Sequence, residues 1–83
     1  MRTLALTTLV ALANPAFAED LGMDTMLGTT MEEVTTSLTN MGYEVRNAEM
    51  EDGKIEVYFV KDKTRGEVYV DPKTGKVTKL EMK

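Results

Sequence analysis

The stretch KIEVYFVKDKTRGEVYV, residues 54–70, contains two runs in which apolar and polar side chains alternate. Alternation with a period of two is typical of β-strands that bury one face. A four-residue loop from Asp62 to Arg65 can join the two runs into an antiparallel hairpin. The facing pairs would then be Val57 with Val70, Phe59 with Val68, and Tyr58 with Tyr69.

Two further runs of strand type flank this hairpin, YEVRNAEM at residues 43–50 and KVTKLEMK at residues 76–83. Asp52-Gly53 is a strong signal for a two-residue turn, because both central positions of a type I′ turn need positive φ. This turn pairs Met50 with Ile55 and Ala48 with Val57. A β-bulge near Asn47 is then needed to bring Val45 to the same face.

A helix is predicted before the strands, in TMEEVTTSLTNMG, residues 30–42. Thr30 followed by Glu33 has the spacing of a capping box, and Gly42 lies where a left-handed residue would end the helix. An apolar stripe follows the helical period and contains Met31, Val34, Leu38 and Met41.

The two faces of the sheet have different compositions. One is apolar and is expected to pack on the helical stripe; it carries Ile55, Val57, Phe59, Val68 and Val70. The other is acidic around two tyrosines; it carries Glu49, Glu56, Tyr58, Val60, Glu67, Tyr69 and Asp71. The predicted fold is α+β, with one N-terminal helix packed on an antiparallel sheet of three to four strands.

The stretch DPKTG, residues 71–75, predicts the turn that leads to the last strand. Asp71 can accept hydrogen bonds from the turn backbone, Pro72 presets φ, and Gly75 can supply a positive φ. A calcium loop is disfavoured here, because Asp71 lacks further carboxylates at alternating positions.

The first 18 residues predict a signal peptide, cleaved before Glu19, since Arg2 precedes a short apolar run and Ala16-Phe17-Ala18 matches a peptidase site. The apolar run is too short to span a bilayer, so no membrane insertion is expected after cleavage. Residues 19–29 have no sustained period and predict a flexible leader or a loosely docked arm, and residues 30–83 form the domain. The expected location is the periplasm or the medium.

Composition excludes several classes of function. Without Arg2 the chain has nine basic and fourteen acidic side chains, a net charge of about −5, which disfavours nucleic acid as a partner. The absence of histidine and cysteine removes the usual bases and nucleophiles, so no enzyme and no cofactor are expected. Glu49 and Glu56 face each other in the predicted register, and we interpret them as two solvated carboxylates rather than a catalytic pair.

The order of helix, GYEV, EDGKIEVYFV and EVYVDPKTGKV resembles the PepSY domain family, over residues 30–83. The matching positions form the fold and are Gly42, Tyr43, Val45, Gly53, Glu56, Val57, Val70, Asp71, Thr74, Gly75 and Val77. The resemblance implies an envelope protein that inhibits or regulates peptidases, or otherwise binds protein, without catalytic residues of its own. Because no peptidase follows Lys83 in this sequence, any inhibition is expected to act in trans.

The predicted partner-binding residues are Tyr58, Tyr69, Glu56 and Glu67, because tyrosine is enriched in binding centres. An exposed strand edge is a second mode of peptide binding, although Lys76, Lys79 and Lys83 would protect the last strand.

A functional alternative of another class is Cu(I) binding through the thioethers of Met23 and Met26, with Met31 nearby. The favoured interpretation is that Met23, Met26 and Leu27 are apolar residues that pack the leader against the helix or fill gaps.

Overall fold

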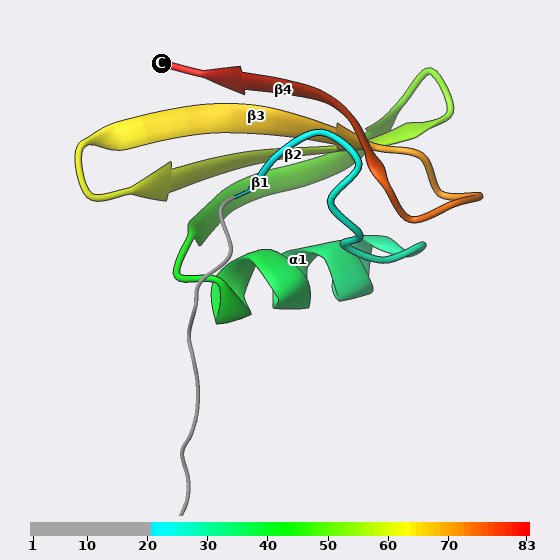
Figure 1. Cartoon of the computed structure of the whole chain (residues 1–83), viewed down its shortest axis with the longest axis horizontal. Helices are drawn as coiled ribbons and strands as arrows, with labels where there is room; N and C mark the ends of the chain where they lie inside the picture. Colours follow the sequence, from blue (N-terminus) through cyan, green and yellow to red (C-terminus); the bar gives the residue numbers. More distant parts are fainter. Residues whose placement is uncertain (1–20) are drawn as a thin grey trace, which may run out of the picture.

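The computed structural model describes residues 21–83, and the predicted signal peptide lies outside them. The elements are α1 (Met31–Asn40), β1 (Glu44–Glu51), β2 (Lys54–Lys61), β3 (Thr64–Val70) and β4 (Val77–Met82). The four strands form one antiparallel sheet in the order β1-β2-β3-β4, and α1 packs on one face of it (Figure 1). The α+β prediction is confirmed. Within the described residues no helix is long and apolar enough to cross a membrane.

Helix α1 begins and ends at the predicted residues. The Glu33 backbone N–H donates to the Thr30 hydroxyl over 3.1 Å, which satisfies one of the free donors of the first turn. The Glu33 carboxylate accepts from the Thr29 N–H over 2.8 Å, one residue earlier than in a capping box. Gly42 ends the helix with φ of 95°, a conformation that glycine adopts without steric cost.

Thr30→Ala is expected to lower the free energy of unfolding by about 1 kcal/mol, because the Glu33 N–H loses its hydroxyl acceptor. Urea denaturation followed by circular dichroism measures the loss, and Thr30→Ser, which keeps the hydroxyl, is the control. Equal stability of the alanine and serine variants would show that the cap contributes nothing.

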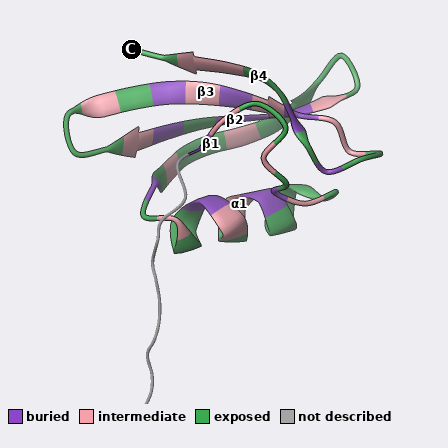
Figure 2. Ribbon diagram, in the orientation of Figure 1, coloured by how far each residue is buried: buried purple, intermediate pink, exposed green. Residues whose placement is uncertain are grey.

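The core lies between α1 and the apolar face of the sheet (Figure 2). Val34 and Leu38 of α1 are fully buried, and Met41 is partly buried against the core. Every residue of the predicted apolar face is buried, namely Ile55, Val57, Phe59, Val68 and Val70. Met31 is the exception to the predicted stripe, since it is 40% exposed at the first turn of the helix.

The hairpin of β1 and β2 forms in the predicted register. Asp52 and Gly53 both have positive φ, 51° and 80°, as a type I′ turn requires. Met50 pairs with Ile55 and Ala48 with Val57, as predicted. The register then shifts between Val45 and Asn47, which confirms the bulge and lets Val45 pack against the core.

The predicted register between β2 and β3 is wrong by two residues. Asp62 adopts φ of 56°, and Lys61 pairs with Thr64, so the strands are joined by two residues instead of four. The observed pairs are Ile55 with Val70, Val57 with Val68, Tyr58 with Glu67, and Phe59 with Gly66. The two tyrosines are therefore diagonal neighbours, and Tyr69 lies opposite Glu56.

The turn between β3 and β4 also holds the segment that precedes α1, residues 21–29, which we call the arm. The Asp71 carboxylate accepts from the Lys73 N–H over 2.8 Å, and Gly75 has φ of 80°, as predicted. The Gly75 carbonyl accepts from the N–H groups of Leu27 and Gly28, over 2.7 and 3.2 Å. The arm is therefore docked on the domain in the structure. The sequence alone left two alternatives for this segment, a flexible leader and a loosely docked arm.

Apolar contacts and backbone pairing both hold the arm. Leu21 and Leu27 are buried in the core cluster. Asp24 donates to the Val77 carbonyl over 3.1 Å, and Val77 donates to the Thr25 carbonyl over 2.9 Å. The arm therefore pairs with the start of β4 and covers that part of the sheet edge.

Candidate functional site

The face of the sheet opposite α1, which we call the outer face, is arranged in rows that cross the strands. The first row runs from β1 to β4 through Glu49, Glu56, Tyr69 and Lys79. The second row runs through Asn47, Tyr58, Glu67 and Glu81. The predicted partner-binding residues are thus brought together in the middle of the sheet, on β2 and β3.

Glu56 is the centre of this group, and it is buried. Only 1% of its surface is exposed, so the expectation that Glu49 and Glu56 are both solvated is wrong for Glu56. The Tyr69 hydroxyl donates to Glu56 Oε2 over 2.9 Å. In this position Glu56 holds the Tyr69 side chain in place and offers little surface of its own to a partner.

A second carboxylate lies beside Glu56. Hydrogen bonding with Glu51 is the main cause that lowers the pKa of Glu56 to about 2, with the Tyr69 hydroxyl adding to it and burial opposing it. The same interaction, together with the charge of Glu56, raises the pKa of Glu51. When Glu51 and Glu56 share a single proton, the proton therefore stays on Glu51.

Both outer-face tyrosines are held in the neutral, hydrogen-bond donating form. Interaction with the Glu56 carboxylate, followed by burial, raises the pKa of Tyr58 to about 12. The same causes raise the pKa of Tyr69 further. Tyr58 is 36% exposed and Tyr69 is half-buried, so Tyr58 presents the larger aromatic surface.

A hollow of about 430 Å³ lies next to Tyr58. Its basic lining residues are Arg46, Arg65 and Lys83, from the β1 bulge, β3 and the chain end. Glu67 also lines it and forms an ion pair with Lys83 over 3.4 Å. The hollow therefore combines a tyrosine ring with positive charge, in contrast to the acidic row that contains Glu49 and Glu56.

The lysines of the last strand lie over this face. The Lys79 ammonium is 5.2 Å from the centre of the Tyr69 ring, within the range of a cation–π contact. Lys79 also forms an exposed ion pair with Glu81 over 3.5 Å. Lys79 and Lys83 thus contact outer-face side chains, beyond the edge protection that the sequence suggested.

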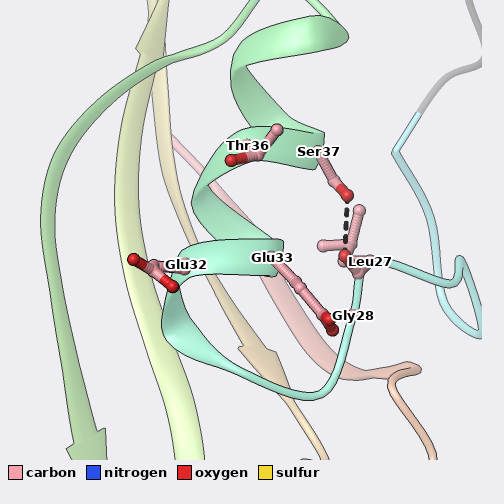
Figure 3. A pocket seen from close by; sticks show the side chains of 6 residues that line it. All are labelled: Leu27, Gly28, Glu32, Glu33, Thr36 and Ser37. Carbon is pink, nitrogen blue, oxygen red and sulfur yellow. Dashed lines mark hydrogen bonds between the residues drawn. The ribbon is translucent and has the colours of Figure 1, made fainter.

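A second hollow, of about 550 Å³, lies between α1 and the arm (Figure 3). Two of its four polar side chains, those of Glu33 and Ser37, already form hydrogen bonds within the protein. Ser37 donates to the Leu27 carbonyl over 2.7 Å, and the Glu33 carboxylate accepts from the Thr29 N–H and hydroxyl. The hydrogen bonds of Ser37 and Glu33 at this hollow therefore join the arm to the helix.

The two methionines of the copper alternative are exposed on the arm. Met23 and Met26 expose about three fifths of their surfaces, and Met26 pairs with Lys76 through its backbone. Copper binding through them stays a prediction.

Four residues of the outer face were absent from the predicted site: Glu51, Arg46, Arg65 and Lys83. Glu51 could have been found, because it lies two residues after Glu49 and alternation places both on one face. The basic residues depend on the bulge at Arg46 and on the two-residue turn of β2 and β3. The bulge was predicted near Asn47, but the two-residue turn was not, so the approach of Arg65 to Arg46 was missed.

Comparison with known proteins gives one family. Residues 2–81 match the family described as peptidase propeptide and YPEB domain, or PepSY. The match includes the segment predicted to be a signal peptide, and that segment stays a prediction. No curated protein and no solved structure matches the chain. Because the match covers nearly the whole chain, this protein belongs to the PepSY family of peptidase propeptide and YPEB domains.

Proposed function

We propose that this protein is a non-catalytic interaction domain of the cell envelope that binds a peptidase in trans and regulates it through the outer face. Domains of the family are generally non-catalytic propeptide or regulatory domains. The observation that carries the proposal is the exposed Tyr58 ring beside a hollow with three basic side chains. Aromatic and arginine side chains at the centre of a contact surface are the residue types that contribute most to protein binding.

Tyr69 and its neighbours give this surface a defined shape. The hydroxyl of Tyr69 is fixed by Glu56, and its ring lies under Lys79. A side chain that is already held in one conformation loses less entropy when a partner binds. Glu56 and Glu67 then act mainly by positioning Tyr69 and Lys83, respectively.

Export is the second part of the proposal. The signal peptide predicted at residues 1–18 supports a periplasmic or secreted location. The mass of the protein recovered from the periplasm tests it, with a chain that begins at Glu19 as the expected result. A full-length chain in the cytoplasm would contradict it.

The binding test uses the exported protein immobilised on beads and exposed to an envelope extract. We expect a peptidase to be retained, and its hydrolysis of a casein substrate to fall when free domain is added. A Tyr58→Ala, Tyr69→Ala double variant should weaken this inhibition at least ~10-fold, because it removes both aromatic surfaces of the contact.

The matched control is the Tyr58→Phe, Tyr69→Phe double variant, which keeps the rings and removes the hydroxyl groups. It separates the ring contacts from the hydrogen bond to Glu56. Circular dichroism and thermal melting establish that each variant is folded. Undiminished inhibition by the alanine variant would exclude the outer face and point to the strand edges.

A further inference from the structure

Three carboxylates of the first hairpin converge at one end of the outer face. Glu49 lies opposite Glu56 in the register of β1 and β2, and Glu51 is two residues further along β1. One oxygen atom from each of the three lies within 4.8 Å of the others. Like charges at this separation repel, so the group is unfavourable unless positive charge joins it.

One oxygen of this cluster is buried without a partner. Glu56 is 1% exposed and its Oε2 accepts from Tyr69, but its Oε1 has no hydrogen-bond partner when Glu51 is ionised. A buried carboxylate oxygen is costly unless a donor or a metal ion satisfies it. This buried oxygen is an observation separate from the number of acidic residues, and either a proton on Glu51 or a bound cation would satisfy it.

The protein supplies no ion pair to these three groups among residues 21–83. The ion pairs in this part of the chain join Arg46 to Glu44, Lys79 to Glu81, and Lys83 to Glu67. All three of these ion pairs therefore use carboxylates outside the cluster. A proton on Glu51, or a cation from solution, must offset the charge of the cluster.

We propose that Glu49, Glu51 and Glu56 bind a hard divalent cation of the calcium class. The ligands are carboxylate oxygens only, which suit hard cations and disfavour copper or zinc. Calcium accepts variable geometry, mono- or bidentate carboxylates and water, whereas magnesium demands a near-ideal octahedron. Two strands of one hairpin supply all three groups, so the site forms together with the fold.

The expected affinity is moderate. Two of the ligands, Glu49 and Glu51, are exposed, and water must fill the remaining coordination positions. Calcium sites of extracellular modules have dissociation constants of about 0.1–1 mM, and this site should fall in that range.

Terbium luminescence provides a direct test, because Tb³⁺ replaces Ca²⁺ at oxygen sites and is sensitised by a nearby tyrosine. The Tyr69 hydroxyl is 2.9 Å from Glu56, so Tb³⁺ in the cluster lies next to an energy donor. Excitation of tyrosine in the whole purified protein should give saturable Tb³⁺ emission, and excess Ca²⁺ should displace it. Folded protein without sensitised emission would overturn the proposal.

Two glutamine variants identify the ligands. Glu51→Gln removes an exposed carboxylate from the cluster and should weaken Tb³⁺ and Ca²⁺ binding at least ~10-fold. The control is Glu44→Gln on the same strand, which makes the same change in charge at a residue paired with Arg46. Its effect should stay within about twofold, since distant surface charges are screened.

Equal losses of Tb³⁺ affinity in Glu51→Gln and Glu44→Gln would show that the cation is attracted to the acidic protein in general. That result would overturn the proposed site. Glu56→Gln should abolish sensitised emission, provided that circular dichroism shows a folded domain. If that variant does not fold, Glu51→Gln alone decides, because its side chain lies at the surface.

Discussion

Replacement of Phe59 by alanine should lower the free energy of unfolding by ~3–5 kcal/mol, which is the loss expected when a buried aromatic ring is removed from a core. Phe59 is among the largest fully buried side chains, with 1% of its surface exposed. Its ring forms an edge-to-face pair with that of Tyr43, with centroids 4.9 Å apart. The contact joins β2 to the segment between α1 and β1, so its loss loosens the helix as well as the sheet.

The loss is large compared with the stability of such a small domain. Stabilities of roughly 0.05–0.15 kcal/mol per residue give about 3–10 kcal/mol for the 65 residues that follow the predicted cleavage site. We therefore expect Phe59→Ala to be largely unfolded at 37 °C, or close to it. Urea denaturation monitored by circular dichroism gives the midpoint, and an unchanged slope would show that the shift of the midpoint reports a change in stability.

Tyr58→Ala is the matched control, because Tyr58 is the adjacent aromatic residue and lies on the outer face. A cross-strand contact on an open face contributes about 0.2–1 kcal/mol, so this variant should lose far less stability. Similar losses in both variants would contradict the assignment of the core to the face covered by α1.

The main elements of the fold follow from local signals in the sequence. Thr30 and Gly42 mark the ends of the helix, and Asp52-Gly53 marks the first turn, because each residue acts through its own backbone conformation. The apolar face of the sheet follows from alternation. These features needed no knowledge of distant contacts, and all of them are present in the structure.

The error in the register of β2 and β3 had a limited effect for a geometric reason. A displacement by two residues keeps every side chain on its predicted face, because the side-chain period of a strand is also two. Only the facing partners differ from the prediction: Tyr69 lies opposite Glu56 and not opposite Tyr58. The turn was missed because Asp62-Lys63 contains no glycine, although Asp62 adopts the positive φ that a short turn requires.

The environment of Glu56 and the position of the arm depend on contacts between distant residues. The buried Glu56 accepts a hydrogen bond from Tyr69 of the neighbouring strand, and this pair exists only in the observed register. The arm docks because Leu27 and Gly28 donate to the carbonyl of Gly75, far along the chain. No short-range pattern in the arm predicts that pairing.

Gly66→Ala should lower the free energy of unfolding by ~1–3 kcal/mol, because a single methyl group would overfill the space between β2 and β4. Gly66 pairs with Phe59 on one side and with Met82 on the other. A β-carbon there would lie 2.9 Å from the Phe59 ring and 3.1 Å from the Met82 sulfur, and would overlap the Glu81 carbonyl oxygen. The Met82 side chain can move aside, whereas the Glu81 carbonyl belongs to the backbone of β4.

Gly22→Ala is the control for the general effect of replacing glycine. Its nearest neighbour would be the Thr25 hydroxyl at 3.9 Å, and its φ is not positive, so alanine fits without strain. We expect unchanged stability or a gain of about 0.4–1 kcal/mol from the restricted unfolded chain. Urea midpoints of the two variants compare them directly.

A double variant separates the two contacts of Gly66. Phe59→Leu removes the ring atom that the new methyl group would meet, but it leaves the Glu81 carbonyl in place. In the Phe59→Leu background, Gly66→Ala should therefore cost less than in the original protein and still be destabilising. If Gly66→Ala cost no stability in the Phe59→Leu background, the strain would come from the Phe59 ring alone. In that case β4 would not approach β3 at Gly66 as closely as the structure shows.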